Sequence, residues 1–205
     1  MMMKNILFIV FISLLAFTAC NQPKPVKTTE NLKAGIKGET TASAKYAAFA
    51  QKAKEEGHDA IAKLFVAASK AESIHAANHK KVLDEIGEKM EDFTPEFEVK
   101  TTTENLQAAI DGETYEATTM YPQFLADAKL EKVAKATKSF TWAYDTEKKH
   151  QEFYTNALQA LNANAENTVA FEYAVCPVCG NTYEKGVIDE KCAFCQTGKE
   201  KFIKI

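Results

Sequence analysis

The chain has 205 residues, enough for one substantial domain and a small one, and its 46% hydrophobic content is ordinary for a globular protein. The formal net charge at pH 7 is −3, and lysines and glutamates are interspersed along the sequence. Because the sequence has no basic block, it lacks the electrostatic footprint of nucleic-acid binding, and we expect small molecules as partners instead.

The first 20 residues differ from the rest of the chain. Lys4 is their only charged residue, and the run from Ile6 to Phe17 is apolar apart from Ser13. A run of this length is typical of the hydrophobic region of a secretory signal and is short for a membrane span, which needs about 20 apolar residues.

The apolar run ends in the sequence FTAC at residues 17–20, which resembles the lipobox of bacterial lipoproteins. We therefore predict a signal peptide over residues 1–19, lipidation of Cys20, and an extended tether with two prolines over residues 20–27. The alternative is a plain cleaved signal with an incidental cysteine. The lipobox predicts an exported protein anchored to a bacterial membrane by its lipid alone, on the periplasmic or cell-surface side.

An internal repeat organises the next part of the chain. The sequence TTENL at residues 28–32 recurs at 102–106, an offset of 74 (102 minus 28). Four further residues recur at an offset of 75: Phe65, Ala68, Glu72 and His75 correspond to Phe140, Ala143, Glu147 and His150. A unit of this length that occurs twice predicts two helical hairpins packed on each other, since a solenoid needs three or more units.

Each half of the repeat predicts two long helices. The first helix runs from about Thr29 to Glu56 and ends at Gly57, and the second runs from about Asp59, a candidate N-cap, towards Gly87. Pro95 then begins a long connection, and the third and fourth helices span about 103–162. Four helices with one long central connection predict a ferritin-like bundle over residues 28–165.

Carboxylates and histidines fall on helix faces that the apolar pattern assigns to the interior. Two Glu-x-x-His pairs each project from one side of their helix: Glu72 with His75, and Glu147 with His150. Three more glutamates lie on the first and third helices: Glu39, its repeat equivalent Glu113, and Glu116 one turn further on. Buried together, such carboxylates would each cost several kcal/mol unless they are protonated or neutralised by cations.

Two iron ions would resolve this conflict. One glutamate from each of two helices and one Glu-x-x-His from each of two others is the ligand set of di-iron bundle proteins. A single Glu-x-x-His is most often a solvated or satisfied pair, but its repetition at equivalent positions makes the signal strong. His58 and His79 lack this context, and we interpret them as surface or packing residues.

The tail of the chain, residues 171–205, is a separate module. It carries two Cys-x-x-Cys pairs that predict one four-thiolate metal site instead of a disulfide framework: Cys176 with Cys179, and Cys192 with Cys195. The spacing alone suits zinc or a single iron, and structural zinc is the commoner case. The predicted di-iron neighbour favours iron, because a bundle that turns over electrons benefits from a one-electron relay.

Taken in order, these motifs resemble the rubrerythrin family over essentially all of the chain after the signal. Residues 112–122, GETYEATTMYP, are especially close to the family pattern, whereas Ala193 stands where proline is common. The resemblance implies an all-α ferritin-like four-helix bundle with a small rubredoxin-like four-cysteine domain. A lipoprotein signal is unusual for this family, which leaves the electron donor open.

The resemblance also implies a role for each ligand. Glu72 and Glu147 would bridge the irons, Glu39 and Glu113 would be terminal ligands, and His150 would bind the second iron. His75 and Glu116 would exchange on the first iron with its oxidation state, with Tyr46 and Tyr121 as hydrogen-bonding partners. The chain would then hold three irons, with zinc as a possible substitute.

The activity implied by the resemblance is a peroxidase that reduces hydrogen peroxide to water. An external donor or reductase would supply electrons through the four-cysteine iron, and in a homodimer this iron would serve the di-iron site of the partner subunit. Two alternatives remain: a ferroxidase or iron-handling protein, since the same bundle oxidises ferrous iron, and a non-catalytic lipoprotein that binds zinc at both sites.

The two halves of the repeat differ by one residue inside the third helix. Tyr46 and Phe49 follow Glu39 by seven and ten residues, whereas Tyr121 and Phe124 follow Glu113 by eight and eleven. The extra residue predicts a π-bulge between Glu113 and Tyr121 that helps the carboxylate of Glu116 to move; the alternative is a shifted alignment without a bulge.

Overall fold

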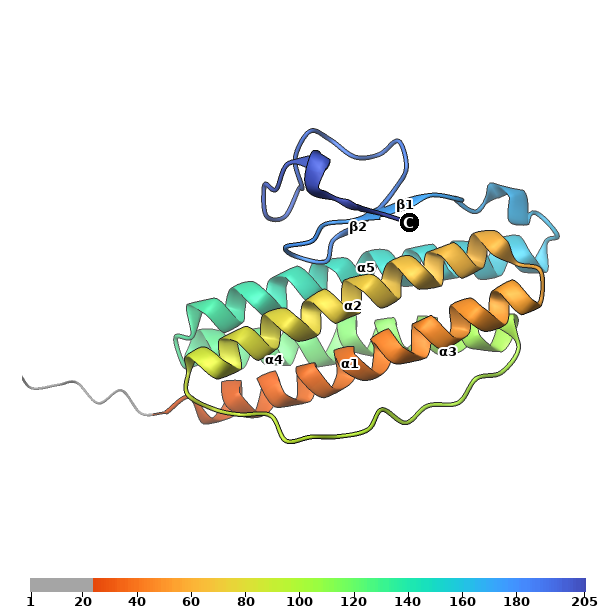
Figure 1. Cartoon of the computed structure of the whole chain (residues 1–205). Helices are drawn as coiled ribbons and strands as arrows, with labels where there is room; N and C mark the ends of the chain where they lie inside the picture. Colours follow the sequence, from red (N-terminus) through yellow and green to blue (C-terminus); the bar gives the residue numbers. More distant parts are fainter. Residues whose placement is uncertain (1–23) are drawn as a thin grey trace, which may run out of the picture.

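The computed structural model describes residues 24–205. The signal peptide, the lipidation at Cys20 and most of the tether therefore lie outside the described residues. The described part of the chain folds into a helical bundle with a small β-sheet module on one side (Figure 1). Among the helices within 24–205, none has a stretch long and apolar enough to cross a membrane.

The first hairpin consists of α1 (Val26–Glu55) and α2 (Asp59–Glu85). Gly57 in the turn between them has φ +87°, a left-handed conformation that favours glycine after a helix. Asp59 is the first residue of α2, and His58 takes the N-cap position without a side-chain cap, so the prediction of Asp59 as the N-cap was wrong by one residue.

Helix α1 begins at Val26, three residues before the expected start, and so includes the end of the segment predicted as a tether. The carboxylate of Glu131 explains this early start. It accepts the backbone N–H groups of Lys27 at 3.0 Å and Thr28 at 2.7 Å, two of the donors that the first turn of a helix leaves without partners. This cap comes from a turn about a hundred residues away, so local sequence did not reveal it.

The connection between the hairpins, residues 86–101, runs along the opposite side of the bundle from the sheet module (Figure 1). It ends in a capping box, in which the Thr101 hydroxyl accepts the backbone N–H of Glu104 and the Glu104 carboxylate accepts that of Thr101. Helix α3 (Thr102–Tyr115) starts from this cap.

The predicted third helix has three parts. Helix α3 continues into the π-helical turn η1 (Glu116–Met120), and α4 (Tyr121–Leu130) follows. The backbone N–H of Tyr121 donates to the carbonyl of Glu116, five residues back instead of four. The one-residue shift in the repeat is therefore a π-bulge, as predicted, and not a shifted alignment.

Helix α5 (Ala134–Asn162) completes the bundle, and the 3-10 turn η2 (Glu166–Thr168) leads to the module. The module contains β1 (Tyr173–Val175), β2 (Thr182–Glu184), the 3-10 turn η3 (Lys199–Lys201) and β3 (Ile203–Lys204). Its sheet has the order β2-β1-β3 with both pairs antiparallel, Ala174 facing Tyr183 and Val175 facing Ile203. Figure 1 shows this sheet over α2 and α5.

Two apolar clusters fill the bundle on either side of its middle. One cluster contains aromatic residues from three helices whose rings contact each other in tilted and edge-to-face arrangements: Tyr46, Phe49, Phe65 and Tyr154. The other contains Leu32, Leu83, Tyr121, Phe124 and Phe140. This architecture confirms the predicted four-helix bundle with one long connection, and it leaves the centre between the clusters for polar residues.

Candidate metal centres

Four helices place acidic and imidazole side chains in the middle of the bundle. Six of them are at most 2% exposed: Glu39 on α1, Glu72 and His75 on α2, Glu113 on α3, and Glu147 and His150 on α5. The repeat explains the arrangement, because equivalent positions in the two hairpins face each other across the same core. The sequence prediction therefore brought together residues that are up to 111 positions apart (150 minus 39).

The six residues form two overlapping sets that could each hold one metal ion. Within each set the ligand atoms lie within 4.8 Å of one another, and the sets are Glu39, Glu72, His75 and Glu147, and Glu72, Glu113, Glu147 and His150. Glu72 and Glu147 belong to both sets. Glu72 and Glu147 could therefore contact both ions, and each ion would have one further glutamate and one histidine.

Both histidines face the shared carboxylates through the same ring nitrogen. His75 Nδ1 lies 2.9 Å from Glu72 Oε2 and 2.9 Å from Glu147 Oε1. His150 Nδ1 lies 3.0 Å from Glu72 Oε1 and 3.1 Å from Glu147 Oε2. The Nε2 atoms point away from the centre, which leaves one nitrogen of each ring for a metal and the other for outer contacts.

Burial makes this cluster costly without cations. Burial, followed by the charge of Glu72, raises the pKa of Glu39 from 4.5 to about 7 and the pKa values of Glu113 and Glu147 well above their usual range. For Glu72 burial acts in the same direction, but His150 and His75 outweigh it and lower its pKa. The arrangement therefore favours positive charge at its centre.

Buried polar atoms without a hydrogen bond indicate where positive charge would bind. Within residues 24–205, six inward-facing atoms are buried and make no hydrogen bond of good geometry, although the imidazole contacts above bring some of them within 3.1 Å of each other: Glu39 Oε2, Glu72 Oε1, Glu113 Oε2, both oxygens of Glu147, and His150 Nδ1. Buried polar atoms normally have partners, and a cluster of orphaned carboxylate oxygens is the donor set that two divalent irons would satisfy. The residues present therefore fit a di-iron centre.

Glu116 lies beside these sets and belongs to neither of them. Its side chain is half-buried on the π-helical turn, and its Oε1 would be 4.0 Å from a Cβ atom built on Gly38. Burial, followed by the charges of Glu39 and Glu113, raises the pKa of Glu116 well above its usual range. In this structure His75, and not Glu116, completes the first set.

The four cysteines of the module converge on a second centre. Their sulfur atoms lie within 4.8 Å of one another, with Sγ atoms 3.4 Å apart for Cys176 and Cys195 and for Cys179 and Cys192, and all four are free of disulfides. Four thiol groups at such distances without a disulfide are the ligand set of a tetrahedral zinc or iron site. Tyr183 Oη donates to Cys192 Sγ at 3.5 Å and supports one ligand from outside.

Comparisons with known proteins decide which kind of centre this is. A family model described as rubrerythrin matches residues 30–158. Nigerythrin of Nitratidesulfovibrio vulgaris is 38% identical over 183 residues, which cover 85% of each chain. Rubrerythrin-2 of Clostridium acetobutylicum is 31% identical over 181 residues, which cover 87% of this chain and 97% of that protein. The chain belongs to the rubrerythrin family.

Solved structures of nigerythrin extend this family assignment to the fold and the metal. A mixed-valence nigerythrin matches with a TM-score of 0.78 and 36% identity, and covers 87% of this chain and 86% of its own. A fully reduced, all-ferrous nigerythrin matches with a TM-score of 0.77 and 35% identity over the same shares. The ferritin-like fold is thus confirmed, and family, structures and ligand sets together support iron as the cofactor of this rubrerythrin-family protein.

In this family member the cysteine module sits directly against the outer side of both histidines. His150 Nε2 lies 2.8 Å from Thr182 Oγ1, and Gly180 lies against the ring of His75. The ammonium group of Lys149 donates to Asn181 Oδ1 at 2.7 Å and to the Thr182 carbonyl, and it also lies 4.2 Å from the centre of the Tyr183 ring. The cysteine module of the chain therefore contacts one histidine of each ligand set in the same chain, while the relay across subunits that the resemblance implies stays a prediction.

The two predicted tyrosines contact the two terminal glutamates. Tyr46 Oη donates to Glu113 Oε1 at 2.6 Å, and Tyr121 Oη donates to Glu39 Oε1. Burial and the adjacent glutamate raise the pKa of each tyrosine well above 10, so both hydroxyls keep their protons. Each terminal glutamate thus has one oxygen held by a tyrosine and the other directed to the centre.

His79 is a residue of this site whose importance sequence reasoning missed. It is fully buried, as a packing residue would be, but its Nε2 lies 3.0 Å from Tyr121 Oη and its Nδ1 lies 2.7 Å from Ser139 Oγ. Burial and the nearby His75 lower its pKa to about 3, so it is neutral. Its position one turn beyond His75, on the same helix face, was the available signal. His58, by contrast, lies near the surface and contacts Glu166 at 2.8 Å.

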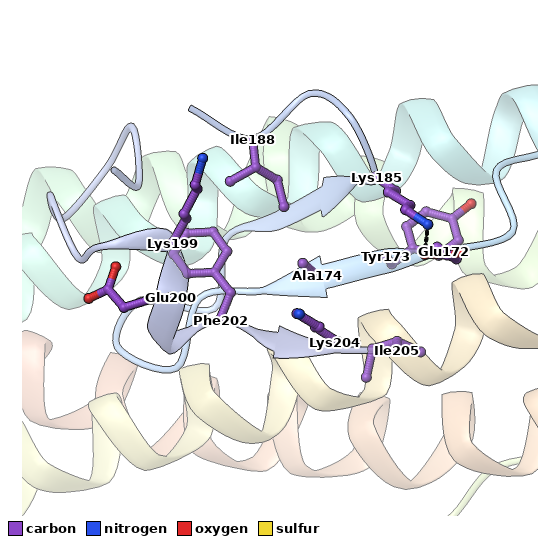
Figure 2. A pocket seen from close by; sticks show the side chains of 10 residues that line it. All are labelled: Glu172, Tyr173, Ala174, Lys185, Ile188, Lys199, Glu200, Phe202, Lys204 and Ile205. Atoms are coloured by element: carbon purple, nitrogen blue, oxygen red, sulfur yellow. Dashed lines mark ion pairs between the residues drawn. The ribbon is translucent and has the colours of Figure 1, made fainter. Parts of the chain in front are cut away.

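A surface pocket of about 590 Å³ lies away from both ligand sets. Figure 2 shows it on the three-stranded sheet, lined by apolar residues such as Ile188 and Phe202 and by Lys185 and Lys199. Lys185 and Lys199 already pair with Glu172 and Glu190. This pocket therefore offers none of the residues of the two ligand sets.

Proposed function

We propose that this rubrerythrin-family protein is a peroxidase that reduces hydrogen peroxide to water at the carboxylate–histidine centre, with electrons arriving through the four-cysteine iron. One observation carries the proposal. The cysteine module rests on the outer nitrogen side of His75 and on His150, the imidazole side chains of the two ligand sets. A one-electron centre whose own module touches a histidine of each set is the arrangement that electron delivery needs.

In this proposal the residues of the bundle have distinct roles. Glu72 and Glu147 would hold both metals, and Glu39, Glu113, His75 and His150 would complete the two sets. When bound, a ferrous pair supplies the two electrons that peroxide reduction requires. The protein surrounds the centre with buried aromatic side chains that limit water, and the tyrosine hydroxyls keep the terminal glutamates oriented.

Exchange between His75 and Glu116 at the first metal is part of the proposal. Two features support it: His75 belongs to the first set, and Glu116 lies beside that set on a π-helical turn. Each residue can therefore approach the same metal from a different helix.

A ferroxidase is the second candidate, because the same bundle ligands suit the oxidation of ferrous iron by oxygen. That reaction consumes no incoming electrons, so the four-cysteine centre would have no role in it. A zinc protein without catalysis would likewise gain nothing from contact between the two centres. The contact thus favours the peroxidase over both alternatives.

Anaerobic reconstitution with iron tests the proposal. The full chain after the signal should hold three irons, and mixing the fully reduced protein with peroxide should oxidise it faster than mixing with oxygen. The double variant Cys176→Ser, Cys179→Ser should lose one iron and all turnover with an external donor, while its prereduced bundle still consumes one equivalent of peroxide. Unchanged steady-state turnover in this variant would contradict the relay, and faster oxidation by oxygen would favour the ferroxidase.

We also propose lipid anchoring at Cys20 and a homodimer. The FTAC sequence and the two prolines after it support the anchor. Fatty-acid labelling of the wild-type chain and its absence in Cys20→Ala, with a shift to the soluble fraction, would be the expected result. Equal membrane retention of Cys20→Ala would contradict lipidation, and a monomeric mass of the iron-loaded protein in solution would contradict the dimer.

A further inference from the structure

A line of hydrogen bonds connects the first ligand set with the surface of the bundle. It starts at Glu39 Oε1, which accepts the hydroxyl of Tyr121. From Tyr121 Oη it continues over 3.0 Å to His79 Nε2, and from His79 Nδ1 over 2.7 Å to Ser139 Oγ. Three helices, α2, α4 and α5, contribute one member each beyond Glu39 on α1.

The line ends at solvent. Ser139, which is 4% exposed, helps to line a surface cleft of about 250 Å³ between α2 and α5, together with Lys81, Lys138 and Trp142. The inner members, His79, Tyr121 and Glu39, are fully buried. Water in the cleft can therefore reach the serine, and protons can reach the interior only along the side chains.

The direction of each hydrogen bond follows from the inner end. A carboxylate that binds a cation is ionised and only accepts, so Tyr121 donates its single proton to Glu39. The tyrosine oxygen must then accept from His79, which places the imidazole proton on Nε2. His79 Nδ1 is left as an acceptor and takes the proton of Ser139. Every donor thus points inward, from the cleft to Glu39.

The repeat-equivalent residues on the Glu113 side of the centre do not form such a line. The repeat equivalent of Tyr121 is Tyr46, which keeps the bond to the other terminal glutamate, Glu113. His79 corresponds to Tyr154, whose buried hydroxyl has no partner among the described residues, and Ser139 corresponds to Leu64, which has no hydroxyl at all. The path to the surface is therefore a property of the Glu39 side and not a by-product of the duplicated fold.

We propose that Ser139, His79 and Tyr121 are positioning residues of a proton relay that carries protons from the cleft between α2 and α5 to Glu39. The relay rests on the proposed peroxidase function. Room for it is provided by Gly35, since a Cβ atom at this position would lie 3.0 Å from Cδ2 of His79.

The reaction requires such a supply. Reduction of one hydrogen peroxide breaks the O–O bond and forms two new O–H bonds, using two electrons from the ferrous pair, which becomes diferric, and two protons from water in the cleft. Each proton enters at Ser139 Oγ, and in one shift the serine proton moves to Nδ1, the Nε2 proton to Tyr121 Oη, and the tyrosine proton to Glu39, which then gives it to a peroxide oxygen and is ionised again. The hydroxyl groups and the imidazole reorient before the second proton passes.

Repeat-equivalent variants test the relay with a matched control. His79→Phe removes the central member, whereas Tyr154→Phe introduces the same side chain at the equivalent position and removes a hydroxyl that has no partner within residues 24–205. In single-turnover oxidation of the prereduced full chain by peroxide, His79→Phe should be slower by about tenfold or more, and Tyr154→Phe should match the wild type. The wild-type rate should fall in D₂O.

Substitutions at Ser139 provide a second test of the relay in case His79→Phe does not fold correctly. Ser139→Ala should slow the same single turnover, Ser139→Thr should restore it because the hydroxyl returns, and Ser43→Ala, which removes a half-buried hydroxyl bonded to the Ser69 carbonyl, should have no effect. Nitrogen NMR of the zinc-loaded protein gives a readout independent of turnover. His79 should be neutral with its proton on Nε2, and Ser139→Ala should shift the Nδ1 signal.

The outcomes separate the relay from the function on which it rests. If peroxide fails to oxidise the prereduced wild type, the peroxidase proposal is wrong and the relay falls with it. If peroxide oxidises the wild type but His79→Phe and Ser139→Ala keep the wild-type rate, only the relay is wrong. A proton on Nδ1 of His79 would also overturn it, because the bonds would then point outward.

Discussion

Because Gly180 has no side chain, the backbone of the cysteine module can approach the bundle closely. The φ of Gly180 is +81°, and a Cβ atom built on it would overlap the ring of His75 and lie 3.1 Å from the carbonyl oxygen of Ala71. The glycine next to Cys179 therefore allows the backbone of the cysteine module to touch α2. The sequence placed this glycine in a cysteine knuckle, but not against a histidine of another domain.

Substitution of Gly180 should separate the module from the bundle. Gly180→Ala adds a methyl group where backbone and ring leave no space, and we expect a loss of about 2 kcal/mol or more in the free energy of unfolding. Gly186→Ala is the matched control, because Gly186 has φ +93° but nothing within 4 Å of its Cβ position, so only the backbone penalty of about 1 kcal/mol applies.

Fluorescence of Trp142 provides a second measurement for this prediction. It is the single tryptophan of the chain and packs against the apolar cluster around the cysteines. Gly180→Ala should change its emission in the folded protein, whereas Gly186→Ala should leave it unchanged. Equal emission and equal stability of both variants would show that the close approach at Gly180 is not needed for docking.

Prediction from the sequence succeeded for residues whose chemical type by itself restricts the surroundings in which they can be buried. The buried cluster, with Glu72 and His75 among its members, was predicted because ionisable residues on an apolar face require neutralisation, and the repeat supplied independent copies. His79 was interpreted as a packing residue because its role depends on Tyr121 and Ser139, which come from two other helices. Single-sequence patterns do not show which side chains meet across helices.

At the level of elements, the π-helical turn η1 was predictable and the start of α1 was not. The turn left a trace in the sequence, since Tyr121 follows Glu113 by one residue more than its repeat equivalent follows Glu39. The start of α1 is set by Glu131, a capping carboxylate from the turn between α4 and α5. An insertion is visible in a repeat, whereas a distant cap is not.

Glu116 tests what the π-helical turn contributes. Glu116→Ala should leave the irons of the bundle in place, because Glu116 belongs to neither ligand set. Steady-state peroxide turnover should nevertheless fall by about 10- to 100-fold, the range typical for loss of a supporting residue near a metal. Iron content and turnover of the same preparation are the measurements.

A control for this variant lies on the same turn. Thr118 is exposed and its hydroxyl bonds the carbonyl of Thr114 within the helix, so Thr118→Ala changes the turn without touching the centre. It should keep full turnover. If Glu116→Ala is as active as Thr118→Ala, then the carboxylate has no part in the reaction and the bulge has another origin.

At the scale of the whole molecule, the sequence predicted two modules but not their contact. The bundle followed from helical periodicity and the cysteine module from its spacing, and each could be inferred within its own segment. Docking depends on Asn78, which donates to the Val178 carbonyl at 2.9 Å, and on Lys149 and Gly180. These residues look like ordinary surface or turn residues until the surfaces are known.

Removal of metal should make the stability of the whole protein depend on pH in an unusual direction. In the metal-free fold the pKa of Glu39 is raised to about 7 by burial and by Glu72, and those of Glu113 and Glu147 are raised as well. Between pH 4.5 and 7 the folded state therefore binds more protons than the unfolded state, so the free energy of unfolding falls as the pH rises.

The effect can be measured with chemical unfolding of metal-free protein at pH 5 and pH 7.5. Glu39 alone should lower the free energy of unfolding by about 2 to 3 kcal/mol across this interval. The raised pKa of His75 acts in the same direction, since its stabilising charge is lost as the pH rises, and the lowered pKa of Glu72 acts only below pH 4.5. Glu39→Gln should therefore reduce the slope.

Iron should reverse this dependence, because a metal binds the deprotonated ligands and its affinity rises with pH over the same interval. The iron-loaded protein, kept anaerobic, should be at least as stable at pH 7.5 as at pH 5. The difference between the two forms measures how far bound cations neutralise the buried carboxylates. Metal-free protein with equal or greater stability at pH 7.5 would show that the cluster is not under the electrostatic strain that its orphaned oxygens indicate.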